Sequence, residues 1–169
     1  MKESEQQKIF KSWLDQHKGL LFKVLRAYAF TQEDREDLFQ EIAAQVWRSI
    51  PNFREESAVT TWLYRIALNI AISWNTKERK KIEPHSIEGM EHLISEKETT
   101  LDERLAWLYD QIKDMNEVDK SLTLLLLDGF SYKEMSDMLG ITESHIGVKI
   151  HRIKKELIKK SEKYEYDGV

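Results

Sequence analysis

The segment from Phe53 to Asn69 combines the kinds of side chain that can hold an unpaired nucleic-acid base. A base taken out of its stack is held by aromatic rings that stack on it and by hydroxyl or amide groups that hydrogen-bond to its edges. These groups occur together here, at Phe53, Arg54, Ser57, Thr60, Thr61, Trp62, Arg65 and Asn69. Trp62 has a second interpretation, because it also falls on an apolar stripe, where tryptophan is more often part of the core.

A second set of candidate side chains lies on a helix near the C-terminus. Helical spacing predicts its buried face, formed by Ile146, Ile150, Ile153 and Leu157. The candidates for DNA contact are the residues at its start and outside this stripe, namely Thr142, Ser144, His145, Gly147, Val148, Lys149, His151, Arg152 and Lys155. Glycine inside a helix costs about 1 kcal/mol relative to alanine. Gly147 therefore either permits close approach to DNA or is a tolerated surface glycine.

No group of residues has the spacing of a catalytic site. Glu88, Glu91 and His92 share a helix face by their spacing and have the types of metal ligands. No second carboxylate and histidine pair accompanies them on a convincing helix, so a solvated acidic face is the favoured interpretation. The hydroxyl residues near histidines occur in no recognisable nucleophile turn. We expect no catalytic residue, no metal and no cofactor, and a protein that is not an enzyme.

Two amphipathic helices are predicted on either side of the first candidate segment. Their apolar stripes are formed by Leu38, Phe39, Ile42, Ala43, Val46, Trp47 and Ile50, and by Trp62, Leu63, Ile66, Ala67, Ile70, Ala71 and Trp74. Pro51 disfavours helical geometry at Ile50 and ends the first of them, which leaves 51–61 as a polar loop. Thr31 is the predicted cap of this helix. A single helix from about Gln6 to Tyr28 is predicted to complete a three-helix core.

The C-terminal part of the chain has the capping and turn residues of a helix-turn-helix. Asn116 is the predicted cap of one helix, which follows an apolar series of Leu101, Leu105, Leu108, Ile112 and Met115. Ser131 to Glu134 has the capping-box pattern of a short helix that ends at Gly140, and Thr142 caps the next helix. This arrangement, in which a glycine turn joins a short helix to a longer one, is the one that places the second helix in the major groove of DNA.

The composition predicts an all-α fold. Hydrophobic residues make up 41% and charged residues 33% of the 169 residues, with only two prolines and six glycines. Strict alternation of apolar and polar residues is missing, so we expect no sheet. No apolar run of about 18 residues occurs, and the polar opening of the chain does not resemble a signal peptide, so no membrane insertion is expected. The absence of cysteine fits a cytoplasmic location.

Charge is distributed unevenly along the chain. The net charge of −4 is unusual for a nucleic-acid-binding protein. Between Ile82 and Glu103 there are seven acids and one lysine, whereas the stretch from Glu143 to Lys163 holds seven bases and three acids. Residues 82–100 also interrupt the helical periodicity. We therefore predict two small helical domains, 1–81 and 101–169, joined by an acidic linker at 82–100.

Three motifs on and between the first pair of amphipathic helices carry a family resemblance. They are Asp37-Leu38-Phe39-Gln40-Glu41, Pro51-x-Phe53-Arg54-x-Glu56-Ser57 and Thr61-Trp62-Leu63-Tyr64-Arg65-Ile66-Ala67-x-Asn69. In order and spacing they closely resemble the second conserved region of bacterial sigma factors of the extracytoplasmic-function (ECF) type. The segment from Leu124 to Leu157 resembles the fourth conserved region of the same family.

This resemblance implies roles for each set of residues. Asp37, Gln40 and Glu41 are expected to bind core RNA polymerase. The segment from Phe53 to Asn69 is expected to capture the melted minus-ten strand of promoter DNA, and the C-terminal helix-turn-helix to recognise the minus-thirty-five element. An anti-sigma factor is a further implied partner. Val59, Gly147 and Val148 depart from residues frequent in the family, which affects the expected promoter sequence.

The leading hypothesis is a sigma factor that binds core RNA polymerase and directs promoter-specific initiation. The alternative is a stand-alone helix-turn-helix regulator, with the N-terminal domain as a sensor or dimerisation unit. That alternative does not account for the motifs from Asp37 to Asn69. A helical metal-dependent hydrolase would require the linker acids and histidines to converge.

Overall fold

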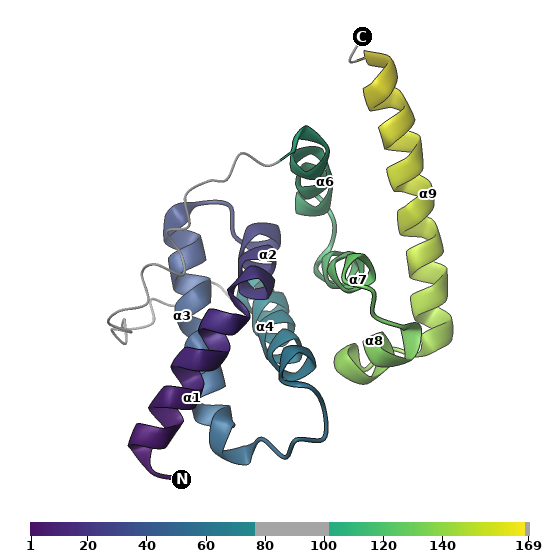
Figure 1. Cartoon of the computed structure of the whole chain (residues 1–169). Helices are drawn as coiled ribbons and strands as arrows, with labels where there is room; N and C mark the ends of the chain where they lie inside the picture. Colours follow the sequence, from purple (N-terminus) through teal and green to yellow (C-terminus); the bar gives the residue numbers. More distant parts are fainter. Residues whose placement is uncertain (77–101, 168–169) are drawn as a thin grey trace. The chain divides into compact units, whose positions relative to one another are not determined.

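In the computed structural model, which describes residues 1–76 and 102–167, every regular element within those ranges is helical (Figure 1). The all-α prediction is confirmed. The chain divides into two compact units, Met1–Glu103 and Arg104–Val169, called here the N-terminal unit and the C-terminal unit. The predicted linker at 82–100 lies outside the described residues, and so do the metal-ligand candidates Glu88, Glu91 and His92. Within the described ranges, no helix combines the length and apolar character needed to span a bilayer.

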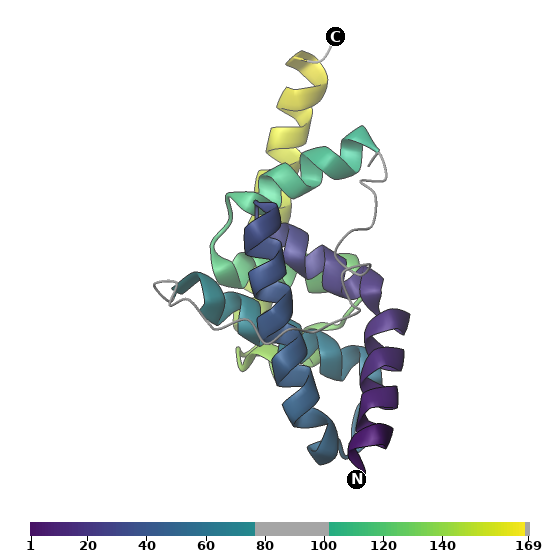
Figure 2. The ribbon, with the colours of Figure 1, turned by 90° about the vertical axis from the view of Figure 1, so that its left-hand side faces the viewer.

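The N-terminal unit has a core of three mutually packed helices and a fourth that lies across one side. The elements are α1 (Glu3–Gln16), α2 (Lys18–Tyr28), α3 (Gln32–Ser49), the 3-10 turn η1 (Ile50–Asn52) and α4 (Val59–Thr76). Helices α2, α3 and α4 contact one another, as the predicted three-helix core requires. Figure 2 shows the N-terminal end of α1 beside η1, and α1 also contacts α3.

The prediction of one helix from Gln6 to Tyr28 was wrong, because the chain bends at His17. His17 has φ −114° and ψ 21°, outside helical geometry, and separates α1 from α2. Hydrogen bonding resumes at once, since the Leu21 N–H donates to the His17 carbonyl at 3.2 Å. Buried apolar residues recur at helical spacing on both sides of the bend, at Phe10, Leu14, Leu21 and Leu25, so periodicity alone does not reveal it. The first turn, from Glu3, was missed because its residues are exposed.

Helix α3 begins as predicted and ends in a different way. The Thr31 hydroxyl accepts a hydrogen bond from the Asp34 N–H at 3.0 Å, which is the expected cap. Ile50, however, keeps helical angles of φ −52° and ψ −46° although it precedes Pro51. Pro51 does not expel Ile50 from helical geometry. The chain tightens instead into η1, where Pro51 occupies a first-turn position that needs no N–H donor.

Helix α4 is longer than predicted and is rotated about its axis. It starts at Val59, so the connection from η1 is shorter than the predicted loop of 51–61. Trp62, Ile66 and Ile70 are only half-buried. The fully buried side chains are those of Leu63, Tyr64, Ala67, Leu68 and Ala71. The rotation was not predictable from the stripe, because Tyr64 and Leu68 extend the apolar surface on one side as far as Trp62 and Ile66 do on the other.

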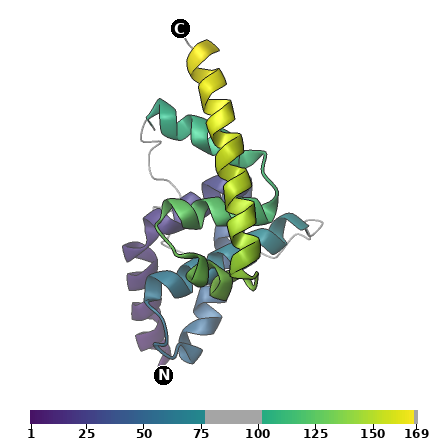
Figure 3. The same ribbon diagram turned by 90° about the vertical axis from the view of Figure 1, so that its right-hand side faces the viewer.

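The C-terminal unit contains the predicted helix-turn-helix. Its elements are α6 (Glu103–Lys113), which begins one residue before the unit boundary, then α7 (Glu117–Leu127), α8 (Tyr132–Leu139) and α9 (Glu143–Asp167). Helices α7 and α8 both pack against α9, which Figure 3 shows along its whole length. Ser131 and Glu134 form the predicted capping box, and Gly140 ends α8 with φ 70°. A left-handed residue at this point favours glycine, which has no Cβ.

The apolar series predicted for the first helix of this unit is only partly buried among its described members. Ile112 is fully buried, whereas Leu105 is 40% exposed and Leu108 is half-buried. Trp107 of the same helix contacts α9, where the ring of Tyr164 lies 5.8 Å from the Trp107 ring, centroid to centroid. Spacing identified α6 as amphipathic, but the extent of its burial depends on neighbours that spacing does not specify.

Candidate nucleic-acid interface

The connection from η1 to α4 presents polar side chains on a sharply turned backbone. All residues from Arg54 to Ala58 are exposed, which places Arg54 and Ser57 at the surface of the N-terminal unit. Glu55 has φ 58°, in the left-handed region that residues other than glycine seldom adopt. Such a conformation costs about 1 kcal/mol or more and persists where the surroundings enforce it.

Three aromatic rings form a closed cluster at the two ends of this connection. The ring centroids of Phe53 and Trp62 are 5.1 Å apart, and Trp13 on α1 lies 5.1 Å from Phe53 and 5.5 Å from Trp62. All three contacts are edge-to-face, an arrangement that aromatic rings favour over stacking face to face. The rings are half-buried. Phe53 and Trp62, both predicted to contact DNA, therefore also hold the structure of the unit together.

The first turns of α4 carry the rest of the predicted minus-ten set. Thr61, Arg65 and Asn69 recur every four residues and so follow one another along the helix surface. Arg65 and Asn69 are exposed and Thr61 is half-buried. Thr60 is exposed in the first turn. The polar groups that can hydrogen-bond to a base thus share one region with the connection from Phe53.

The predicted polymerase-binding residues lie on the side of α3 that faces away from the core. Asp37 is exposed, and Gln40 and Glu41 are half-buried. Leu38 and Ile42, on the opposite side of the helix, are fully buried. This surface offers carboxylates to a basic partner.

The start of α9 presents most of the predicted minus-thirty-five set to solvent. The exposed members are Thr142, Ser144, His145, Val148, His151, Arg152 and Lys155, and the half-buried members are Gly147 and Lys149. The Thr142 hydroxyl accepts a hydrogen bond from the His145 N–H at 3.2 Å, so this residue also caps α9. The buried side of α9 is the predicted one, with Ile146, Ile150 and Ile153 in the core and Leu157 half-buried.

Gly147 lies against the short helix α8. A Cβ at this position would meet the Tyr132 ring at 3.5 Å, an ordinary van der Waals distance. The space beside Gly147 is therefore occupied by a side chain of the same unit. Its contact with DNA stays a prediction, and the neighbouring ring would accommodate a Cβ, so the ring does not require glycine at this position.

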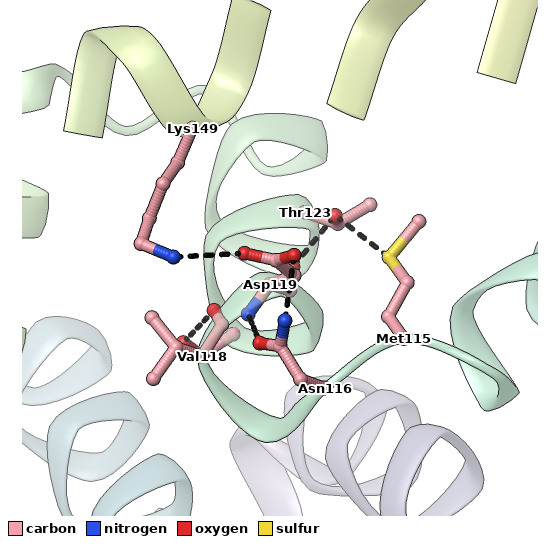
Figure 4. A network of polar contacts seen from close by, with 7 residues as sticks. Met115, Asn116, Val118, Asp119, Thr123 and Lys149 are labelled. Atoms are coloured by element: carbon pink, nitrogen blue, oxygen red, sulfur yellow. Dashed lines mark hydrogen bonds and ion pairs between the residues drawn. The ribbon is translucent and has the colours of Figure 1, made fainter. Parts of the chain in front are cut away.

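Asp119 is the centre of a polar network that joins α7 to α9 (Figure 4). The Asp119 N–H donates to Oδ1 of Asn116, and Nδ2 of Asn116 donates to Oδ2 of Asp119, each at 2.9 Å. The Lys149 Nζ lies 3.6 Å from Asp119 Oδ1, a buried oxygen with no hydrogen-bond partner. Lys149 is thus directed toward α7 and offsets the burial of a carboxylate oxygen. A DNA-binding role for Lys149 stays a prediction.

Lys120 is a buried cation beside this network, with only 3% of its side chain exposed. Burial lowers the pKa of Lys120, and attraction by Glu117 and Asp114 partly opposes this shift. The Glu117 Oε1 lies 3.8 Å from the lysine Nζ. The folded protein binds the ammonium proton of Lys120 less tightly than the unfolded chain does. The contribution of Lys120 to the free energy of unfolding therefore rises with pH between its lowered pKa and the ordinary value.

Replacing Lys149 by methionine is expected to destabilise the packing of α9 on α7. The change keeps an apolar stem and removes the charge opposite Asp119, at a cost of about 1 kcal/mol for a half-buried pair. We expect faster amide hydrogen exchange in α7 and α9, measured by mass spectrometry. Lys154→Met, at an exposed position of the same helix, is the control. Equal exchange rates in the two variants would contradict a structural role for the ion pair.

Sequence reasoning missed two residues that organise these surfaces. Trp13 was predicted only as part of the core helix from Gln6 to Tyr28, and its contact with two distant rings has no local signal. Asp119 did have a local signal, because Asn116 and Asp119 have the spacing of a reciprocal cap. Its pairing with Lys149 requires the tertiary fold.

Comparison with known proteins assigns both units. Residues 13–81 match the family model of sigma-70 region 2, and residues 108–157 match that of sigma-70 region 4. The chain is 28% identical over 158 residues to the ECF RNA polymerase sigma-E factor of Haemophilus influenzae, covering 86% of this chain and 83% of that protein. It is 28% identical over 137 residues to the RNA polymerase sigma factor YlaC of Bacillus subtilis, covering 75% and 77% of the two proteins.

Solved structures share the fold at lower sequence identity. The sigma factor RpoE of Bartonella quintana, solved with the anti-sigma factor NepR, has a TM-score of 0.63 and 19% identity, covering 90% of this chain and 98% of that one. CnrH, solved with the cytosolic domain of CnrY, has a TM-score of 0.62 and 16% identity, covering 92% and 89%. The two sigma regions, in this order, together span most of the chain. The chain therefore belongs to the ECF family of RNA polymerase sigma factors, which direct promoter-specific transcription initiation.

Proposed function

We propose that the two structural units divide promoter recognition between them. The observation that carries this proposal is that each conserved sigma region falls within one compact unit. Residues 1–81 then bind the polymerase and open the minus-ten element, and residues 101–169 recognise the minus-thirty-five element. Residues 82–100 act as the acidic linker between them.

The minus-ten function is supported by the grouping of polar and aromatic side chains at the start of α4. Arg54, Ser57 and Thr60 are exposed on the connection and the first turn of α4, and Arg65 and Asn69 are exposed further along this helix. Several hydrogen-bonding groups are therefore available to successive bases of a displaced strand. Thr61 and the rings of Phe53 and Trp62 complete this surface. Strand capture by these residues would favour the melted promoter over the duplex, because the contacts form only with an unpaired base.

The minus-thirty-five function is supported by the exposure of the first turns of α9. In a helix-turn-helix, the N-terminal residues of the second helix contact base edges in the major groove. Ser144, His145 and Val148 occupy that position here, and Arg152 and Lys155 follow as exposed cations suited to phosphate.

The experiment that tests the assignment is run-off transcription from a genomic library with purified chain and core RNA polymerase. We expect transcripts from a small set of start sites that neither component produces alone. Base changes in the upstream and downstream elements of those promoters would then be matched to variants of each unit. Transcription that needs only one unit would contradict the division of labour, and repression without initiation would favour the stand-alone regulator.

Loss of the acids on α3 is expected to weaken polymerase binding without unfolding the chain. Asp37→Ala combined with Glu41→Ala removes two negative charges from the surface opposite the core. We expect about tenfold weaker binding to core polymerase in a fluorescence titration, from the loss of complementary charge contacts. Glu3→Ala with Glu5→Ala, at exposed positions of α1, makes the same change in net charge and is the matched control. Equal affinities of both double variants would contradict the assignment.

An anti-sigma factor is the further partner that we propose. Two structural neighbours were solved as complexes, RpoE with an anti-sigma factor and CnrH with the cytosolic domain of CnrY. A similar inhibitor would regulate this chain by occupying surfaces that polymerase needs. We further propose that the chain acts in the cytoplasm, where its polymerase is, and acts by binding and not by covalent catalysis.

A further inference from the structure

The aromatic cluster connects the proposed strand-capturing surface to α1, a helix that carries none of the predicted DNA-binding residues. From this geometry we infer that Trp13 is a positioning residue for capture of the melted promoter strand. This inference rests on the proposed minus-ten function. Trp13 acts through Phe53 and Trp62 and not by touching DNA itself.

The sequence positions of the three rings show what Trp13 holds in place. Phe53 precedes the exposed connection and Trp62 follows it, so contact between these two rings closes a loop that contains Ser57 and Thr60. Trp13 contacts both rings, with interplanar angles of 78° and 76°. It thereby supplies two of the three edge-to-face contacts in the cluster. Because such contacts depend on ring orientation, Trp13 fixes the geometry of both ends of the loop.

The backbone of the loop requires such a restraint. Glu55 has a left-handed conformation, and every residue from Arg54 to Ala58 is exposed. An exposed segment buries little surface that would stabilise this conformation from within. Residues in unfavourable backbone regions keep them where the surrounding structure enforces them. The ring cluster at its two ends is the restraint that the structure provides.

A fixed loop matters for binding because ordering a mobile segment reduces affinity. If the loop sampled many conformations in the free protein, strand capture would have to select one of them. With the ends held, Ser57 and Thr60 are already arranged before the DNA opens. Loss of Trp13 should therefore reduce affinity for the single strand even though no DNA contact is removed.

Helix α1 offers a matched control for this inference. Phe10, three residues before Trp13, contacts Trp47 on α3 in another edge-to-face pair, with centroids 5.3 Å apart and an interplanar angle of 88°. The Gln6 side chain also donates a hydrogen bond to the Trp47 carbonyl at 2.7 Å. Phe10→Leu thus weakens the attachment of α1 to the unit without touching the loop. Trp13→Leu removes contacts to the loop from the same helix.

The experiment measures binding of a fluorescent single-stranded oligonucleotide to the holoenzyme. The oligonucleotide carries the minus-ten element of a promoter identified by run-off transcription. We expect Trp13→Leu to bind it about tenfold more weakly, from the loss of two aromatic contacts, while Trp13→Phe stays within about twofold of the parent. Phe10→Leu should bind normally, and all variants should bind core polymerase equally. Equal oligonucleotide affinity for Trp13→Leu and the parent, or an equal loss in Phe10→Leu, would overturn the inference.

A further variant and a further measurement distinguish a wrong inference about Trp13 from a wrong proposed function. Asn69→Ala tests the proposed function directly: normal oligonucleotide binding by this variant would refute strand capture at this surface. Weak binding by Asn69→Ala together with normal binding by Trp13→Leu would overturn only the positioning role. If Trp13→Leu does not fold, Trp13→Met takes its place, with the same tenfold loss expected. Amide exchange at residues 54–58 of the free chain should be faster in the folded Trp13 variant and unchanged in Phe10→Leu.

Discussion

Alanine at both Ser57 and Asn69 is expected to reduce transcription from duplex promoters by about 10- to 100-fold, the effect of losing two hydrogen bonds to the captured strand. Both side chains are exposed, so their removal leaves no buried polar group and should not alter folding. Binding to core polymerase should be unchanged, because the polymerase contact is assigned to α3. The defect should appear as reduced permanganate reactivity of thymines at the start site.

The control for this experiment is another exposed amide of the same unit. Gln7→Ala shortens an exposed amide side chain on α1, which is not one of the predicted DNA-binding residues, and should initiate normally. A pre-melted promoter should also restore part of the lost activity, because the cost of opening is then removed in advance. Normal permanganate reactivity in the double variant would exclude these residues from strand opening.

The features that the sequence predicted well are determined by residues close together in the chain. Thr31, Asn116 and Ser131 each accept a hydrogen bond from the N–H three residues later, at distances from 2.9 to 3.1 Å. Gly140 takes the left-handed conformation that ends α8. Caps and turns depend on a few adjacent residues, so their patterns were sufficient to place α3, α7, α8 and α9.

The features that the sequence did not predict depend on contacts between distant segments. A smooth apolar stripe is compatible with one straight helix or with the bend at His17, and only packing of α1 on α3 distinguishes them. The rotation of α4 has the same origin, because Tyr64 and Trp62 are equally suitable for burial by residue type. The side that faces the core is decided by α2 and α3.

The candidate DNA-binding residues likewise divide into those whose placement follows from local sequence and those whose placement depends on distant contacts. Exposure of Asn69, Arg65 and Arg152 followed from helical spacing. The inward direction of Lys149 did not, since a lysine beside an apolar stripe has no local signal for its partner 30 residues earlier at Asp119. Residue types thus predicted the two surfaces, whereas the fold determined which members of each set also stabilise the unit.

The isolated chain is expected to bind promoter DNA weakly at physiological salt. Neutralisation of phosphates supplies most nonspecific affinity, and α9 contributes a net charge of only +4 between Glu143 and Lys163 against −4 for the whole chain. We expect dissociation constants no tighter than about the micromolar range of nonspecific complexes. Core polymerase should restore specific binding, since it holds both units at once and so raises the effective concentration of each second contact. A mobility-shift titration with and without core polymerase measures this difference.

Within the complex, Arg152→Ala is expected to weaken binding to the upstream element about tenfold, the effect of losing one good base or phosphate contact. Lys154→Ala removes the same charge from the same helix, two positions along, where the side chain points in a direction about 160° away. Lys154→Ala should reduce affinity for the upstream element much less, because α9 cannot present both residues to one DNA surface. Equal losses in the two variants would mean that α9 contributes only general charge. Tight, sequence-specific binding by the chain without polymerase would contradict the need for two simultaneous contacts and would favour a regulator that acts alone.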